Sequence, residues 1–142
     1  CSHLQSLSVF SNPSITTRGW QRLATILESS NSNLDCLDVD QNNVDDDAVD
    51  LFASALMNNH TLKTLNLDNN PSITLKGWQS FSKVLCNTSK VNTTFLSNHT
   101  LCDLGNGLNE NEIIEPILDL NGRNDKKEVA MIKIPQNHDD FD

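Results

Sequence analysis

The chain has 142 residues, with 19 Asp and Glu against 10 Lys and Arg, and its net charge is -9 at pH 7. This charge argues against nucleic acid as a partner, because a phosphate-binding surface needs clustered Lys and Arg. The sequence has no apolar run long enough to span a membrane and no phosphate-binding loop, nucleophile elbow, dinucleotide fingerprint or calcium loop. We therefore expect a protein that is not an enzyme, inserts into no membrane and holds no cofactor or metal.

One apolar spacing, L-x-x-L-x-L-x-x-N with Val allowed at the third leucine, occurs three times along the chain. The three copies run from Leu4 to Asn12, from Leu34 to Asn42 and from Leu62 to Asn70. The central residues of each copy alternate between apolar and polar, which predicts a short strand with one buried side. Apolar residues at helix spacings follow each copy, so we predict strand-helix repeats over 4–33, 34–61 and 62–93.

An asparagine closes each predicted strand, where the chain must turn away from the sheet. Asn12, Asn42 and Asn70 stand at the same offset from the first leucine of their repeats. A buried carboxamide both donates and accepts hydrogen bonds, so we predict that the three form a structural ladder that satisfies backbone groups at the turns. The alternative is three turn asparagines with no shared role.

Each predicted helix has a small residue at the same position, which is Gly19, Ala48 or Gly77. Glycine costs about 1 kcal/mol relative to alanine inside a helix, so we interpret the glycines as positions of close approach to a neighbouring helix. Trp20 and Trp78 follow the two glycines, and we interpret them as rings packed between adjacent helices. The alternative is a paired aromatic contact site for a ligand.

Beyond Leu85 the leucine pattern becomes irregular. Leu101, Leu104 and Leu108 make a poor fourth leucine run that is interrupted by two glycines. We therefore predict that the repeat domain covers residues 1–108 and ends with a degenerate fourth repeat.

Two short apolar stripes follow at helix spacing. They cover residues 112–120 and 125–134, and Pro135 is expected to end the second helix. Together they predict a C-terminal helical cap over 109–135, which covers the open end of the repeats. We expect residues 136–142 to be a mobile tail.

The repeats resemble a known family. Leucine strands that are closed by Asn and followed by a full helix are similar to the ribonuclease-inhibitor-like class of leucine-rich repeat proteins. The phrase N-P-S-I-T at 12–16 and 70–74, and more weakly the segment 124–130, also resemble a large algal family of such proteins, particularly in diatoms. The resemblance implies an α/β solenoid, a right-handed horseshoe arc with parallel strands on the concave face and helices on the convex face. It also implies a concave protein-binding face and no catalytic residues.

The outward side of the predicted strands is the best candidate for a binding surface, because solenoids bind partners on their concave faces. Its residues fall into three columns across the repeats. The columns are Ser6, Cys36 and Thr64, then Ser8, Asp38 and Asn66, then Phe10, Asp40 and Asp68. This face is polar and acidic, so we expect a protein partner with a basic patch. The alternative is an exposed sheet surface that is polar only for solubility.

The compartment and the wider context leave alternatives open. Cys1, Cys36, Cys86 and Cys102 have neither zinc-site nor disulfide-framework spacing, so we expect free thiols in the cytoplasm. Four sequons, at Asn59, Asn87, Asn92 and Asn98, would instead suit a glycosylated ectodomain that is secreted or on the cell surface. The first strand begins at Leu4 with no polar cap before it, so we expect a C-terminal fragment of a longer protein. A further alternative is the non-catalytic part of a small-GTPase regulator.

Overall fold

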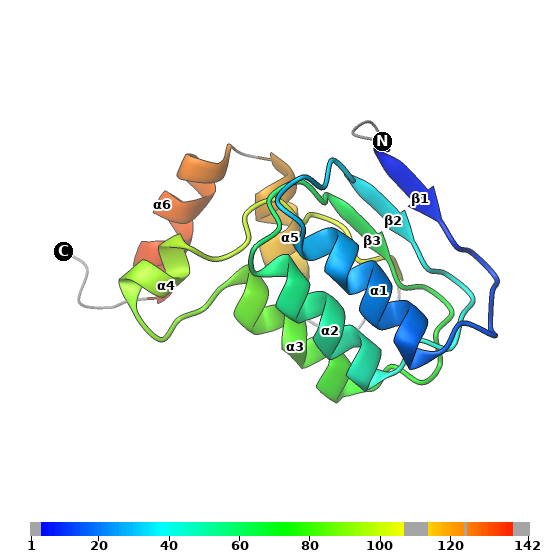
Figure 1. Ribbon diagram of the computed structural model, residues 1–142. Helices are drawn as coiled ribbons and strands as arrows, with labels where there is room; N and C mark the ends of the chain where they lie inside the picture. The colour runs from blue at the N-terminus through cyan, green and yellow to red at the C-terminus, as the bar shows by residue number, and fades with distance from the viewer. Residues whose placement is uncertain (1–3, 107–113, 124, 138–142) are drawn as a thin grey trace.

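The computed structural model describes residues 4–106, 114–123 and 125–137. Strands and helices alternate in its first part, in the order β1 (Ser6–Ser8), α1 (Thr17–Glu28), β2 (Cys36–Asp38), α2 (Asp46–Leu56), β3 (Thr64–Asn66) and α3 (Leu75–Leu85). The helices α4 (Val91–Phe95), α5 (Glu115–Arg123) and α6 (Lys126–Asn137) follow. Figure 1 shows the three strands as one layer and α1, α2 and α3 as a second layer beside it, with α4 and α6 at the end away from β1. The fold is an α/β solenoid, as predicted.

The strands form a parallel sheet in the order β1-β2-β3. Leu7 pairs with Leu37, and Leu37 pairs with Leu65, so equivalent leucines of the three repeats lie side by side. Leu37 and Leu65 are fully buried between the sheet and the helices. The period of two in the sequence therefore places one side of the strands in the core and leaves the other side open.

The first strand is covered less well than the other two. Leu4 opens the first copy of the leucine spacing, yet 53% of its surface is exposed, whereas its counterparts Leu34 and Leu62 are buried. No described strand lies on the outer side of β1. A leucine in this repeat therefore lacks the neighbour that buries the equivalent side chain in the next repeat.

Trp20 and Gly77 lie against a neighbouring helix, as predicted. The predicted role is not seen for Trp78, whose ring contacts Phe81 of the same helix, or for Gly19, where an added Cβ would meet Ile15 just before the same helix. Trp20 of α1 is buried and makes an edge contact with Phe52 of α2, with ring centroids 6.2 Å apart. A Cβ atom on Gly77 would lie 2.5 Å from Asp46 Oδ1, and the Gly77 N–H donates to that oxygen. Hydrogen bonds from the hydroxyl and N–H of Thr74 also lower the pKa of Asp46. The start of α3 is thus tied to the start of α2 through one carboxylate.

A fourth strand-like segment follows β3. Asp103 forms an isolated parallel bridge with Thr64, and the N–H of Leu65 donates to the Asp103 carbonyl over 2.9 Å. Leu101 and Leu104 beside it are fully buried, while Leu108 lies outside the described residues. This segment therefore continues the sheet without forming a regular strand.

The C-terminal helices differ from the prediction at their boundaries. The helix expected over 112–120 is described from Glu115 to Arg123, and residues 112 and 113 lie outside the described part of the chain. Pro135 was expected to end the last helix, but α6 continues to Asn137 with Pro135 inside its last turn. The missing proline N–H removes one hydrogen bond there, and two further residues complete the turn. Residues 136 and 137 therefore belong to α6, and 138–142 are outside the described residues.

Candidate functional site

The strand-closing asparagines hold the turns that shape the open strand face. Asn42 Nδ2 donates to the carbonyls of Val9, Val39 and Asp40, and its Oδ1 accepts from the N–H of Asn12 over 3.0 Å. Asn70 makes the equivalent bonds one repeat later, where its Oδ1 accepts from the N–H of Val44 over 3.0 Å. Asn42 and Asn70 are buried and Asn12 is exposed. The carboxamides of Asn42 and Asn70 thus each join two successive repeats, whereas that of Asn12 donates to the carbonyls of Val9 and Phe10 in its own repeat.

Each of these asparagines follows a residue in the left-handed backbone region. The φ angles of Ser11, Gln41 and Asn69 are 55°, 52° and 51°. Non-glycine residues rarely adopt this conformation, which is sterically costly, so the surrounding hydrogen bonds must hold it. The three turns consequently have the same shape at the same edge of the sheet.

The middle column of the strand face is a continuous hydrogen-bonded row. Ser8 Oγ donates to Asp38 Oδ2 over 2.8 Å, and Asn66 Nδ2 donates to Asp38 Oδ1 over 3.1 Å. Asp38 Oδ1 also accepts from the N–H of Asp40. The Asp38 carboxylate, half-buried at the centre of this row, is therefore fixed by donors that carry no charge.

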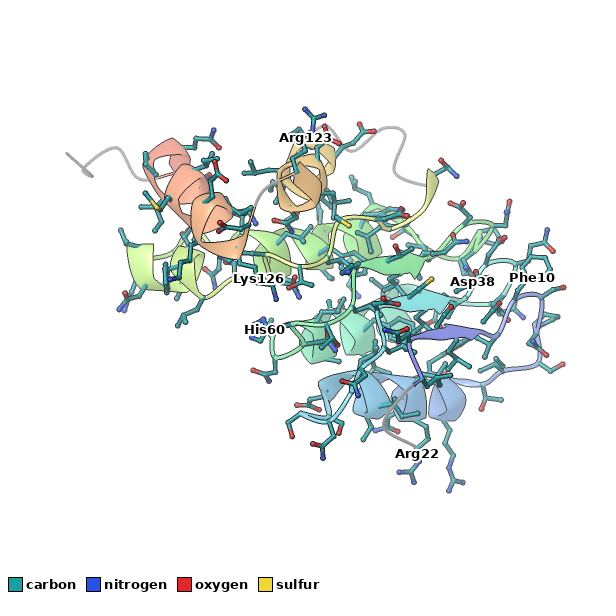
Figure 2. The ribbon with its side chains drawn as sticks, turned by 90° about the horizontal axis from the view of Figure 1, so that it is seen from above. Phe10, Arg22, Asp38, His60, Arg123 and Lys126 are labelled. Carbon is teal, nitrogen blue, oxygen red and sulfur yellow. The ribbon has the colours of Figure 1, made fainter. Side chains whose placement is uncertain are left out.

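The other two columns lie on either side of that row. Ser6, Cys36 and Thr64 are paired in register on the three strands, as are Ser8, Asp38 and Asn66. In the third column, Asp40 Oδ1 accepts from Asn69 Nδ2 over 2.9 Å, and Asp68 accepts from the N–H and the Nδ2 of Asn106. Phe10 is 48% exposed at the rim, where Figure 2 shows it beyond Asp38. The structure thus gathers the three columns on one face and adds Asn106, which the sequence pattern did not indicate.

A second set of polar side chains lies at the opposite end of the strands. Asn59 Nδ2 donates to the carbonyl of Leu27 over 2.7 Å, and Asn98 Nδ2 donates to that of Leu56 over 2.9 Å. Leu27 and Leu56 stand in the last turns of α1 and α2. The recurrence of Asn-His-Thr-Leu at 59–62 and 98–101 is the sequence signal that could have revealed this pair.

At the end of α3, Lys133 donates to the helix carbonyl as Asn59 and Asn98 do at the ends of α1 and α2. Its Nζ donates over 2.8 Å to the carbonyl of Leu85, the last residue of α3, and over 2.8 Å to Asn121 Oδ1. Lys133 is 1% exposed, and burial lowers its pKa to about 8. The position near the carbonyl end of a helix favours a cation. A lysine from α6 therefore occupies the place that an asparagine occupies in the preceding repeats.

His99 completes the surroundings of Lys133. Its Nε2 donates to the carbonyl of Phe95 over 3.0 Å, so Nδ1 is the acceptor that Lys133 Nζ faces at 3.1 Å. Burial, and then the charge of Lys133, lower the pKa of His99. The imidazole is thus held neutral as a structural bridge between α4 and α6.

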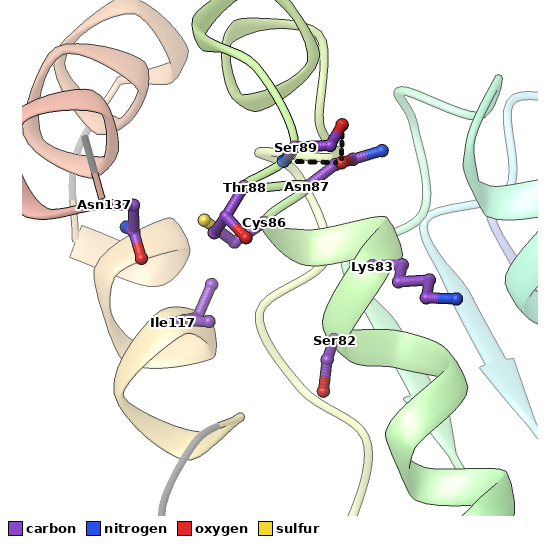
Figure 3. A pocket seen from close by; sticks show the side chains of 8 residues that line it. All are labelled: Ser82, Lys83, Cys86, Asn87, Thr88, Ser89, Ile117 and Asn137. Atoms are coloured by element: carbon purple, nitrogen blue, oxygen red, sulfur yellow. Dashed lines mark hydrogen bonds between the residues drawn. The ribbon is translucent and has the colours of Figure 1, made fainter.

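A hollow of about 590 Å³ lies where the end of α3 faces α5 and Asn137 (Figure 3). Its lining includes Cys86, and burial raises the pKa of that thiol, so Cys86 is held in the protonated form. The thiolate is the reactive form of cysteine. The hollow therefore presents no activated nucleophile at Cys86.

The structure also bears on the cysteines, on metal binding and on membrane insertion. Cys36, Cys86 and Cys102 are free cysteines, and Cys1 is outside the described residues. Within the described ranges, no group of three or more His, Cys, Asp or Glu side chains could hold a metal ion. No helix in those ranges is both long and apolar enough to cross a membrane.

The sequons differ sharply in accessibility. Asn59 and Asn98 are buried, and their Nδ2 atoms, which would carry a glycan, donate hydrogen bonds to backbone carbonyls. Asn87 is half-buried, and Asn92 is exposed on α4. The folded chain therefore has room for a glycan at Asn92 but not at Asn59 or Asn98.

Comparisons with known proteins agree with this architecture. A family model described as leucine-rich repeat matches residues 1–24, 30–53 and 58–82. Among solved structures, actin-binding site 2 of leiomodin-1 is similar to the chain with a TM-score of 0.60 and 21% sequence identity, over 93% of this chain and 87% of that one. No curated protein matches the chain. At this identity, the structural likeness shows the fold alone.

Proposed function

Because the chain belongs to the leucine-rich repeat family, we propose that it is a protein-binding module whose open strand face contacts the partner. Members of repeat families use extended concave surfaces for binding, which supports a non-catalytic role. The solved neighbour is named for a site that binds actin, which also favours a protein as the partner. We place the chain in the ribonuclease-inhibitor-like class, because each of its three repeats returns through a helix of 11 or 12 residues.

The row from Ser8 through Asp38 to Asn66 is the observation that carries the proposal. A face whose polar groups are already fixed by hydrogen bonds loses little conformational entropy when a partner arrives. Asp38 and Asp40 add negative charge, and the side chains that donate to them are neutral. A partner with a Lys/Arg-rich patch would therefore gain charge-assisted contacts on this face.

The experiment measures how quickly a captured partner associates. A partner recovered by affinity capture should bind the double variant Asp40→Asn with Asp68→Asn several-fold more slowly than the parent at low salt, because electrostatic steering sets association rates. The matched control is Asp47→Asn with Glu28→Gln, which removes the same charge from exposed positions on α2 and α1. Equal rates for the parent and the strand-face variant would refute the proposed contact.

We propose the cytoplasm as the compartment, since Cys36, Cys86 and Cys102 are unpaired thiols and two of the four sequons are buried. A secreted or cell-surface form would carry glycans on Asn92 or Asn87. A role as the non-catalytic part of a small-GTPase regulator would use the same strand face, and recovery of a GTPase as the partner would distinguish it.

A further inference from the structure

Large apolar side chains are exposed where α4 lies beside the end of α2. Met57, Phe95 and Leu96 are 52%, 53% and 69% exposed. Phe95 is the last residue of α4, and Leu96 follows it directly. Side chains of this size are usually buried, and an exposed cluster of them marks an interaction site.

Two hollows flank Leu96. One, of about 220 Å³, is lined by Phe95, Leu96 and Ala130 together with Lys126, Lys127 and His60. The other, of about 150 Å³, lies between Leu96 and Met57 and is also lined by Lys83. Leu96 thus separates the two hollows and lines both of them.

The charge around these hollows is opposite to that of the chain as a whole. The net charge is -9, yet no Asp or Glu is among the residues that line either hollow, whereas Lys83, Lys126 and Lys127 are. The nearby carboxylate of Asp125 is occupied in capping α6, where its Oδ1 accepts from the N–H groups of Lys127 and Glu128. Lys126 Nζ is held against the His60 carbonyl over 2.9 Å, and Figure 2 shows both residues at this end.

The backbone that carries Phe95 and Leu96 is held by hydrogen bonds. The Phe95 carbonyl accepts from His99 Nε2, and Thr94 Oγ1 donates over 2.8 Å to the carbonyl of Asn87. Thr94 and His99 are both buried. The short helix α4 is therefore anchored to the repeats by the residues beside its exposed apolar ones.

We propose that this surface is a second docking site, which binds an acidic peptide segment of a partner protein through a bulky apolar side chain seated beside Leu96. The apolar side chain fills a hollow, and the flanking carboxylates meet Lys126 and Lys127. The site is separate from the strand face and opposite to it in charge. One module could then join two partners of opposite charge.

The test uses fluorescence polarisation with a labelled peptide that contains one Phe and one Leu among Glu residues. The full chain should bind it with a dissociation constant below about 1 mM. Leu96→Ser and Lys127→Glu should each weaken binding by at least about fivefold, as expected for anchor and charge contacts. Replacement of the Glu residues of the peptide by Gln should weaken binding as well.

Two matched variants control for nonspecific effects. Met131→Ser changes a side chain that is 71% exposed on α6 but lines neither hollow, and Arg22→Glu reverses a charge on α1, far from Lys126 in Figure 2. Both should leave peptide affinity unchanged, as should Asp40→Asn with Asp68→Asn on the strand face. The last comparison separates this site from the proposed function.

Four results would overturn the proposal. They are no binding of the peptide up to about 1 mM, equal affinity for a peptide with Lys in place of Glu, equal weakening by the control variants, and binding of phosphatidylserine vesicles without binding of the peptide. The last result would assign the basic apolar surface to a membrane instead of a protein.

Discussion

The three repeats and the C-terminal end satisfy the same backbone groups with different chemistry. At the ends of α1 and α2, the carbonyls of Leu27 and Leu56 accept from asparagine amides, whereas the Leu85 carbonyl of α3 accepts from the ammonium of Lys133. A carboxamide both donates and accepts, so it can pass hydrogen bonds from one repeat to the next. An ammonium only donates. Lys133 therefore ends a series of helix-end contacts that Asn59 and Asn98 pass from one repeat to the next.

The substitution that should destabilise the chain most lies in the repeats. Asn42→Ala removes one donor from each of the carbonyls of Val9, Val39 and Asp40 and also removes the acceptor of the Asn12 N–H, so four hydrogen bonds at one junction between repeats are lost. We expect a loss of about 3 kcal/mol in the free energy of unfolding, measured by urea denaturation.

The matched control for this variant is Asn12→Ala. Asn12 is the exposed first member of the series Asn12, Asn42 and Asn70, and its Nδ2 donates to two backbone carbonyls. The control substitution should cost less than about 1 kcal/mol. Asp38→Ala is a poorer control, because Asp38 accepts from Ser8, Asn66 and the N–H of Asp40. Equal costs for Asn42→Ala and Asn12→Ala would contradict the idea that buried asparagines join the repeats.

A smaller effect, confined to the other region, is expected for Lys133→Met. The substitution keeps the side-chain length but leaves the Leu85 carbonyl, Asn121 Oδ1 and His99 Nδ1 without their donor. Relief from burying a charge offsets part of this loss, so we expect about 1 to 2 kcal/mol.

Hydrogen exchange locates the effect of Lys133→Met. Amide protection should fall in α4, α5 and α6 and persist in α1 and α2. The control Lys127→Met, at an exposed position on the same helix, should leave amide protection unchanged in all of these helices. Loss of protection throughout the repeats would mean that the two regions unfold as one unit.

The smallest expected effect is a pH dependence of the same region. The pKa of His99 is lowered in the folded chain by burial and by Lys133, so the unfolded chain binds a proton at a higher pH. Stability from the neutral imidazole is complete above the unfolded pKa of about 6.5 and declines as pH falls below it. Denaturation at pH 7 and pH 5 should show this decline in the parent, and His99→Gln should flatten it. A parent and variant with the same pH dependence would exclude His99 as its source.

The regular part of the fold follows from sequence periodicity. Leucines at a fixed spacing placed the three strands and helices, because a repeat with a neighbour on each side buries the same positions as the repeat before it. Leu4 is exposed, unlike Leu34 and Leu62, because β1 has a described neighbour on one side only. Sequence periodicity therefore predicts the burial of a leucine best in a repeat that has a neighbouring repeat on each side.

The irregular part could not be predicted in this way. Lys133 looks like an ordinary surface lysine in the sequence, and the packing of α6 against α4 and α5 brings its Nζ to the Leu85 carbonyl. Asn106 reaches Asp68 from the degenerate fourth leucine run, where the spacing is too irregular to place single side chains. Such contacts join residues far apart in the chain, and they produce no regular spacing in the sequence from which they could be predicted.

Carboxylate labelling tests most directly whether the strand face binds the partner. The captured complex and the free chain would be treated with a carbodiimide and glycine ethyl ester, and modification of each carboxylate would be measured by mass spectrometry. If the strand face binds the partner, Asp38, Asp40 and Asp68 are protected in the complex, while the exposed Asp47 and Glu28 on the helices remain as reactive as in the free chain. Protection of Asp47 and Glu28 with unchanged labelling of the three strand-face aspartates would contradict binding at the strand face.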